Sequence, residues 1–221
     1  IKGILGAGKA IGKSAVGQAA GKVKTTFNDR LEDVREMWET SQSPIIYKLS
    51  AAWDMVSSET EVGIAVRELR RLDPNFSIDD WKQDVVENML RPFLEAFLRG
   101  DGRALNQYCG EAVYNRLNQE IRQRKADGQV LDPHVMEIEN DELLAVQLDD
   151  SGGGTPTILI QFMAQQVNCV RNREGEIVEG GEDQIRANYY VLAFQRHYDE
   201  DTAVLRWVIA DFLLVGAFPY L

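Results

Sequence analysis

Carboxylate side chains at two places in the sequence have the chemical type that acid–base catalysis uses. Glu137, Glu139, Asp141 and Glu142 stand close together, and Asp211 lies in an apolar stretch. Two carboxyl groups can act as acid and base where burial drives their pKa values apart. The first group alternates with apolar residues, which is typical of the solvated face of a strand. Asp211 is the better candidate for a base in a cavity, although a capped or outward-facing aspartate is the commoner case.

Histidine and cysteine, the other residues with catalytic or metal-binding chemistry, are few. The two histidines, His134 and His197, have no partner at the spacing of a metal site. Cys109 has no basic neighbour in the sequence that would lower its thiol pKa, so we expect Cys109 and Cys169 to be buried or inert. The sequence therefore predicts no catalytic residue, no metal ion and no cofactor.

The segment 6–14, GAGKAIGKS, superficially resembles a phosphate-binding loop. That motif requires a glycine five positions before its Gly-Lys-Ser, so that backbone amides can surround the phosphates. Ala7 occupies this position, and no predicted strand precedes the segment. The resemblance does not predict nucleotide hydrolysis.

Amide side chains interrupt the apolar strand that we predict over residues 157–170. Gln166 and Asn168 share a strand face with Phe162, because strand side chains alternate with period two. Two interpretations remain open. Either these residues and Asp211 line a partly polar pocket beneath the helices, or the row turns to solvent near a hairpin.

A basic, glycine-rich arm precedes an acidic body. Residues 1–24 contain five lysines and no acidic residue, whereas the whole chain has a net charge of −11. On a helical wheel, Lys2, Lys9, Lys13 and Lys24 fall within about 60° of each other. Such a stripe can lie on an anionic membrane. The alternative is a solvated arm, because each glycine weakens a helix by about 0.5–1 kcal/mol.

Length and composition are those of a globular protein. Of the 221 residues, 44% are hydrophobic and 27% are charged. The longest uncharged apolar stretch, 212–221, is too short to span a bilayer. The net negative charge argues against direct nucleic-acid binding by the whole protein.

Hydrophobic periodicity predicts helices in the first part of the chain and strands in the second. Apolar residues recur at helical spacing in several segments: 27–38, 45–56, 61–72, 78–99 (with Pro92 expected to kink it), 104–108 and 111–126. Strand patterns follow at 135–148, 157–170, 177–198 and 202–215. Helices followed by a meander of strands predict an α+β fold with an antiparallel sheet.

Three runs in order along the chain resemble one family. They are WETSQSPIIYK at 38–48, the pair ETE at 59–61 and RRLDPNF at 70–76, and VNCVRNREGEIVEG at 167–180. Together they resemble the C-terminal half of the Tim44-like family of mitochondrial inner-membrane translocase subunits. The resemblance runs from about residue 28 to about residue 212, and no motif in it is catalytic.

The resemblance implies a fold and a division of the chain. It implies a nuclear-transport-factor-two-like cone, in which N-terminal helices precede a curved antiparallel sheet. The expected organisation is a basic arm at 1–26, an amphipathic membrane-proximal segment at 27–72 and a Tim44-like α+β domain at 73–221. The expected lipid-binding residues are Lys2, Lys9, Lys13, Lys24, Trp38, Ile45, Ile46, Leu49 and Trp53.

The resemblance also implies a function without catalysis. A family member acts as a scaffold, peripheral on the matrix side of the mitochondrial inner membrane. Its implied partners are the translocase channel subunits, the mitochondrial heat-shock chaperone of the seventy-kilodalton class with its J-type cochaperones, and cardiolipin. The glycine run 152–154 and the apolar ending 213–221 depart from the family pattern. They leave open a structural subunit of the large mitoribosomal subunit or of another inner-membrane assembly. An enzyme on a related fold is a third hypothesis.

Overall fold

The computed structural model describes residues 59–147, 156–199 and 203–220. All of them belong to the second of the two compact units into which the chain divides, Ser41–Leu221. The predicted arm and the predicted helices at 27–38 and 45–56 lie outside the described residues, so the predicted boundary at residue 26 stays a prediction.

A helical layer begins the described part. Helix α3 (Glu59–Leu72) precedes α4 (Ile78–Val85), which continues through a π-helical turn, η1 (Val86–Leu90), into α5 (Arg91–Arg99). Two further helices, α6 (Gly102–Asn106) and α7 (Glu111–Ala126), complete the layer. The Ser77 side chain caps α4 by accepting a hydrogen bond from the Asp80 backbone N–H.

The predicted kink at Pro92 takes the form of the π-helical turn. Pro92 is the second residue of α5, and η1 ends two positions before it, at Leu90. Proline has no backbone N–H and cannot complete the α-helical pattern, and a wider turn before it keeps the helix continuous. The helix then ends at Gly100, which has a left-handed φ of 69°.

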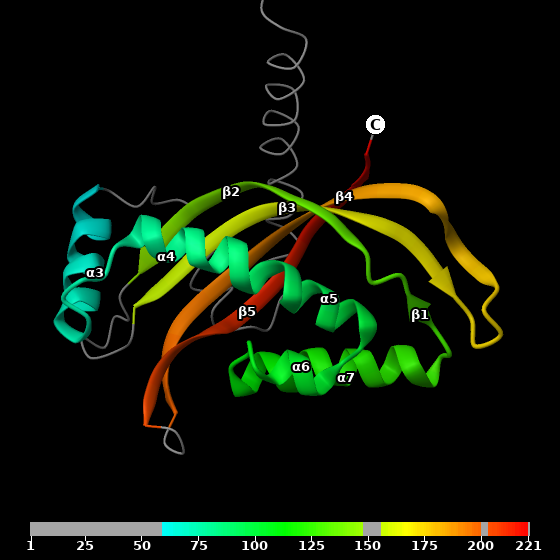
Figure 1. The fold of residues 1–221 in the computed structure, drawn as a ribbon, viewed down its shortest axis with the longest axis horizontal. Helices are drawn as coiled ribbons and strands as arrows, with labels where there is room; N and C mark the ends of the chain where they lie inside the picture. Colours follow the sequence, from blue (N-terminus) through cyan, green and yellow to red (C-terminus); the bar gives the residue numbers. More distant parts are fainter. Residues whose placement is uncertain (1–58, 148–155, 200–202, 221) are drawn as a thin grey trace, which may run out of the picture. The chain divides into compact units, whose positions relative to one another are not determined.

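An antiparallel sheet follows the helices. Its strands are β1 (Val130–Leu131), β2 (Val135–Gln147), β3 (Thr157–Arg171), β4 (Ile177–Asp199) and β5 (Val204–Pro219). Both β1 and β2 pair with one side of β3, β4 pairs with its other side, and β5 pairs with β4. The sheet curves over α5, α6 and α7 (Figure 1). This confirms the predicted α+β fold of the nuclear-transport-factor-two-like cone.

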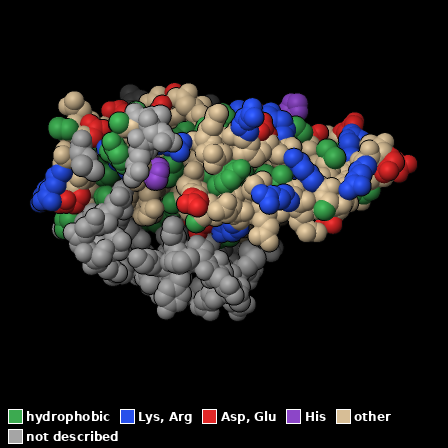
Figure 2. Space-filling view, turned by 90° about the horizontal axis from the view of Figure 1, so that it is seen from below, with side chains coloured by type: hydrophobic (Ala, Val, Ile, Leu, Met, Phe, Trp, Pro, Cys, Tyr) green, Lys and Arg blue, Asp and Glu red, His purple; other side chains and the backbone are tan. Residues whose placement is uncertain are grey.

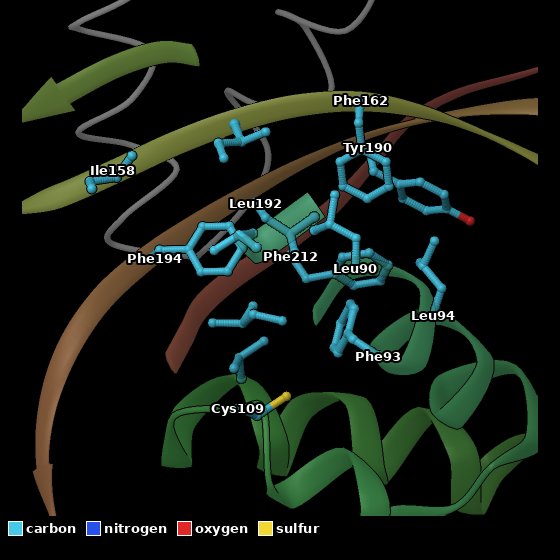
Figure 3. Packing of buried hydrophobic residues seen from close by; sticks show 14 of the residues in the cluster. Leu90, Phe93, Leu94, Cys109, Ile158, Phe162, Tyr190, Leu192, Phe194 and Phe212 are labelled. Carbon is cyan, nitrogen blue, oxygen red and sulfur yellow. The ribbon is translucent and has the colours of Figure 1, made fainter. Parts of the chain in front are cut away.

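The main hydrophobic core fills the concave side of the sheet. Side chains from alternate positions of β3 and β4 meet the helix that runs from α4 to α5 (Figure 3). Phe93 and Phe97 of α5 make edge-to-face contacts with Phe212 of β5, with ring centroids 5.0 and 5.5 Å apart. The other members of this contact surface include Ile158, Ile160, Phe162, Tyr190, Leu192, Phe194, Leu90 and Leu94.

The outer edge of β5 is bonded to the loop before α7. The Ile209 N–H donates to the Tyr108 carbonyl at 2.8 Å, and the Gly110 N–H donates to the Ile209 carbonyl at 2.8 Å. Arg116 of α7 donates to the Phe212 carbonyl at 2.7 Å. These bonds attach α7 to the strand whose side chains it helps to bury.

An irregular pairing marks the end of β3 and β4. Cys169 pairs with Gly180 and Val167 pairs with Ile185, so residues 181–184 of β4 oppose Asn168 alone. Gly180 has a φ of 71°, and a Cβ added there would lie 1.8 Å from the Asn168 carbonyl oxygen. Only glycine allows this close approach, which explains a glycine at the end of the run that resembles the family.

Candidate functional site

The residues predicted to bind lipid all precede residue 59. Lys2, Lys9, Lys13, Lys24, Trp38, Ile45, Ile46, Leu49 and Trp53 therefore lie outside the described residues. Their role in lipid binding stays a prediction.

Two of the four predicted pocket residues, Phe162 and Gln166, both contact Tyr190 on the concave face of the sheet. Phe162 is fully buried, and its ring centroid lies 5.5 Å from that of Tyr190. Gln166 is also buried, and its Oε1 accepts hydrogen bonds from the Tyr190 hydroxyl at 2.9 Å and from the Asn188 amide. The Tyr190 ring in turn stacks on Phe212 at 5.2 Å.

The chemistry of this group is neutral hydrogen bonding. Burial raises the pKa of Tyr190 to about 12, while its bonds to Gln166 and Asn188 oppose that rise. The phenol is therefore protonated near neutral pH and acts as a donor. The Gln166 Nε2 is buried without a partner in the part of the chain that the structure describes. The strand register brings the side chains of Gln166, Asn188 and Tyr190 together, and no sequence motif predicts this group.

Asn168 and Asp211 lie elsewhere. Asn168 is half-buried at the irregular end of β3, where its Nδ2 is 3.5 Å from Gln184 Oε1. Asp211 is buried on β5, and its Oδ1 accepts hydrogen bonds from Arg116 at 2.6 Å and from the Phe212 N–H at 2.8 Å. Phe162 and Gln166 thus share contacts with Tyr190, Asn168 and Asp211 make other contacts, and contact of any of the four with a ligand stays a prediction.

The acidic group on β2 is mostly solvated, as its alternation predicts. Glu137 and Glu142 are exposed, and Asp141 is half-buried in an ion pair with Lys82 at 2.9 Å. Glu139 is half-buried and accepts a hydrogen bond from Gln165 at 3.3 Å. Burial, and then the neighbouring Glu137 carboxylate, raise the pKa of Glu139 above its ordinary value.

The cysteines are buried, as expected, and the histidines lie at the surface. Cys109 and Cys169 are free and buried, and burial raises the pKa of the Cys109 thiol to about 12. His134 and His197 are exposed. Within the described ranges, no group of three histidine, cysteine or acidic side chains is placed to hold a metal ion.

A buried arginine that sequence reasoning missed joins the α3–α4 corner to the sheet. The Arg196 side chain is 8% exposed, and its guanidinium donates to Asp73 at 3.1 Å. The same guanidinium lies 5.1 Å from the ring centroid of Trp207 and 5.6 Å from that of Phe76. Asp73 and Phe76 both belong to the RRLDPNF run, so this part of the resemblance marks a structural contact. The contact of Arg196 with Trp207 follows from the pairing of β4 with β5, which the sequence alone does not give.

The surface of the described residues carries charges of both signs. Basic side chains are spread among acidic ones over the face that carries α6 and α7 (Figure 2). None of the helices in the described ranges is both long enough and apolar enough to cross a membrane.

The fold and its contacts define a class of protein: an α+β cone with an apolar core beneath a curved antiparallel sheet and polar groups held in structural hydrogen bonds. The profile of the Tim44-like domain matches residues 62–212. The chain therefore belongs to the Tim44-like family, which confirms the resemblance.

Three curated relatives are mitochondrial import inner membrane translocase subunits. TIM44-1 of Arabidopsis thaliana is 34% identical over 165 residues, which cover 75% of this chain and 34% of the relative. TIM44 of Homo sapiens is 31% identical over 192 residues (84% and 42%), and TIM44 of Saccharomyces cerevisiae is 27% identical over 219 residues (88% and 49%). The chain thus spans between a third and a half of the length of these relatives.

Proposed function

We propose that this chain is the C-terminal scaffold domain of a mitochondrial inner-membrane protein translocase. The observation that carries the proposal is the match of residues 62–212 to the Tim44-like domain, together with relatives whose names place them in the import translocase. The finer proposal is that the domain works on the matrix side, where it recruits the heat-shock chaperone and its J-type cochaperones to the channel.

The described side chains support a scaffold over an enzyme. The carboxylates that acid–base chemistry would use are solvated or held in structural contacts, as Asp211 is by Arg116. The buried polar group around Gln166 is neutral and bonded within the sheet. These residues stabilise a rigid domain, whose outer surface is free to bind partners.

Membrane contact is the second part of the proposal. The basic arm would bind anionic lipid through its lysines, each of which contributes about 1 kcal/mol near a negatively charged surface. The apolar residues of 45–56, including Leu49 and Trp53, would insert at the interface. Cardiolipin, with two phosphates in one headgroup, is the lipid that we propose.

Affinity capture from a mild-detergent extract of mitochondria, followed by mass spectrometry, tests the translocase assignment. The full chain should recover translocase channel subunits and the matrix chaperone, and ATP should release the chaperone. A stoichiometric set of ribosomal or respiratory subunits without the chaperone would overturn the assignment. It would favour the other function that the apolar ending leaves open, a structural subunit of another mitochondrial assembly.

A further inference from the structure

The outer edge of β5 changes character halfway along the strand. Up to Phe212, the loop before α7 and the Arg116 side chain bond to this edge. Beyond Phe212, the strand runs away from α6 and α7 (Figure 1). The stretch 212–221 contains no charged side chain. The second half of β5 is therefore an apolar edge strand, the kind of strand on which another strand can add.

Hydrogen bonds at the two ends of this stretch establish which peptide groups point away from β4. The Phe212 carbonyl accepts a bond from Arg116 of α7, so it points outward. Because the peptide groups of a strand alternate between its two sides, those of Leu214 also point outward. At the other end, the Tyr220 N–H donates to the Ile185 carbonyl of β4 and so points inward.

The same alternation, counted back from Tyr220, turns the peptide groups of Pro219 and Ala217 outward. The two counts meet at a β-bulge, where Val215 is the extra residue of β5. Pro219 has no N–H, and the outward side of an edge strand is where a sheet tolerates proline. The position of Pro219 therefore agrees with the assignment.

Two N–H groups and two C=O groups on this edge are available to another strand, those of Leu214 and Ala217. We call them the open groups. The N–H and the carbonyl of Phe212 both have side-chain partners already. No hydrogen bond joins the outward side of Leu214 or Ala217 to any residue that the structure describes. Both residues lie at the surface, Leu214 with 42% of its area exposed.

The opposite edge strand of the sheet, β2, is protected in two ways. Arg91 of α5 donates to the Val135 and Met136 carbonyls, and Lys82 of α4 donates to the Asp141 carbonyl at 3.3 Å. The strand also carries four carboxylates, and charged side chains oppose the addition of a further strand. The second half of β5 has neither protection among the described residues.

We propose that a second copy of this chain adds to β5 as an antiparallel strand, so that the two sheets join across a two-fold axis. An axis between Val215 and Gly216 brings Leu214 of each copy opposite Ala217 of the other. The N–H and C=O of each residue then bond to the C=O and N–H of the residue opposite. All open groups of both copies are satisfied, as a self-complementary two-fold interface requires.

The flanking residues favour a second copy as the occupant. The same axis places Phe212 of each copy opposite Pro219 of the other. Phe212 already uses both of its peptide groups, and Pro219 has no N–H to place, so this pair needs no further bond. The absence of charge at 212–221 also lets the two edges approach, although each chain has a net charge of −11.

The length of the contact indicates a reversible dimer. The stretch 212–219 is shorter than the roughly 20–30 residues a side of a standard protein interface. Sedimentation equilibrium of the full chain should therefore show a mass that rises with concentration from 24.9 kDa toward about twice that value. A mass of one chain at every concentration up to the solubility limit would overturn the proposal.

Disulfide formation between two variants, each with one added cysteine, tests the register. Directly opposed, hydrogen-bonded residues have Cα atoms about 5.5 Å apart, which a disulfide can bridge. A mixture of Leu214→Cys and Ala217→Cys should therefore cross-link under mild oxidation. Leu214→Cys alone should cross-link far less, because its two copies lie about 10 Å apart along the strands. The native cysteines are buried.

Proline substitution tests whether the outward backbone makes the contact. Ala217→Pro removes an open N–H and leaves the bonds to β4 in place, so it should weaken dimerisation about tenfold or more. Ala217→Val keeps the N–H and should dimerise like the unaltered chain. Slow reaction of the buried Cys109 with a thiol reagent verifies that each variant is folded.

Three further results would overturn the proposal. Equal cross-linking of Leu214→Cys alone and of the mixture would contradict the two-fold register. A dimer that persists in folded Ala217→Pro would place the contact elsewhere. In the dilute, monomeric chain the Leu214 and Ala217 amides should exchange hydrogen rapidly. Slow exchange there would mean that another segment of the same chain occupies the edge.

Discussion

At the scale of single residues, Arg196 makes a buried contact whose removal should destabilise the fold. Arg196→Ala removes a buried guanidinium that bonds to Asp73 and stacks on two aromatic rings. We expect a loss of about 1–3 kcal/mol in the free energy of unfolding, measured by urea denaturation, because a charged hydrogen bond and its packing disappear together. Arg103→Ala, an exposed arginine of α6, is the control. An equal effect of both variants would contradict this role.

Glu139 gives a prediction about pH. Its pKa is raised in the folded state, so folding favours the protonated form, and ionisation at neutral pH destabilises the fold. Glu139→Gln should therefore increase stability at pH 7. The gain should shrink as the pH falls through the raised folded pKa toward 4.5, and it should be lost below about 4.5, where the carboxyl group is protonated in both states.

Thermal denaturation of Glu139→Gln between pH 7 and about pH 4 measures whether the stability gain falls as the pH falls. Glu174→Gln removes an exposed carboxylate at the turn between β3 and β4 and serves as the control. A gain for Glu139→Gln that grows toward low pH would contradict the assigned cause.

At the scale of elements, two glycines of the hairpin between β3 and β4 allow a matched comparison. Gly175 and Gly180 both have left-handed backbones, with φ of 87° and 71°. Gly175→Ala should cost about 1–2 kcal/mol for the backbone conformation alone, since nothing lies within 4 Å of the added Cβ. Gly180→Ala should cost clearly more, because the Cβ would clash with the Asn168 carbonyl. Urea denaturation should rank the two variants in this order.

The placement of helices and strands shows what the sequence could and could not predict. Alternation correctly placed Phe162 and Gln166 on the face toward the helices. Asn168 lies farther along β3, where four residues of β4 oppose it and its amide contacts Gln184, an irregular pairing that the alternation of one strand could not predict. The bond between Arg116 and Asp211 joins residues 95 positions apart, so no local pattern could predict it. Pro92 predicted a disturbed helix, but not that a π-helical turn would keep it continuous.

At the scale of the whole molecule, the separation of a basic arm from an acidic body predicts salt-sensitive membrane binding. Replacing Lys9 and Lys13 with glutamine should weaken binding to cardiolipin vesicles about tenfold or more at low salt, because each lysine contributes about 1 kcal/mol. Rising salt should weaken membrane binding by the unaltered chain, because salt screens exposed charges. It should also reduce the difference in binding between the unaltered chain and the double variant. Flotation across a salt series measures both. Binding that ignores salt would contradict an electrostatic attachment.

The bonds along the outer edge of β5 have a consequence for how the protein behaves in a crowded compartment. A bare edge strand is a template on which strands from other chains can add, and such addition leads to aggregation. Tyr108, Gly110 and Arg116 occupy the peptide groups of Ile209 and Phe212 that would otherwise offer this template. Unfolded polypeptides therefore find this part of the sheet already closed. The proposed role in import would bring such chains near the domain, where they would meet side-chain surfaces at this edge and not a free backbone.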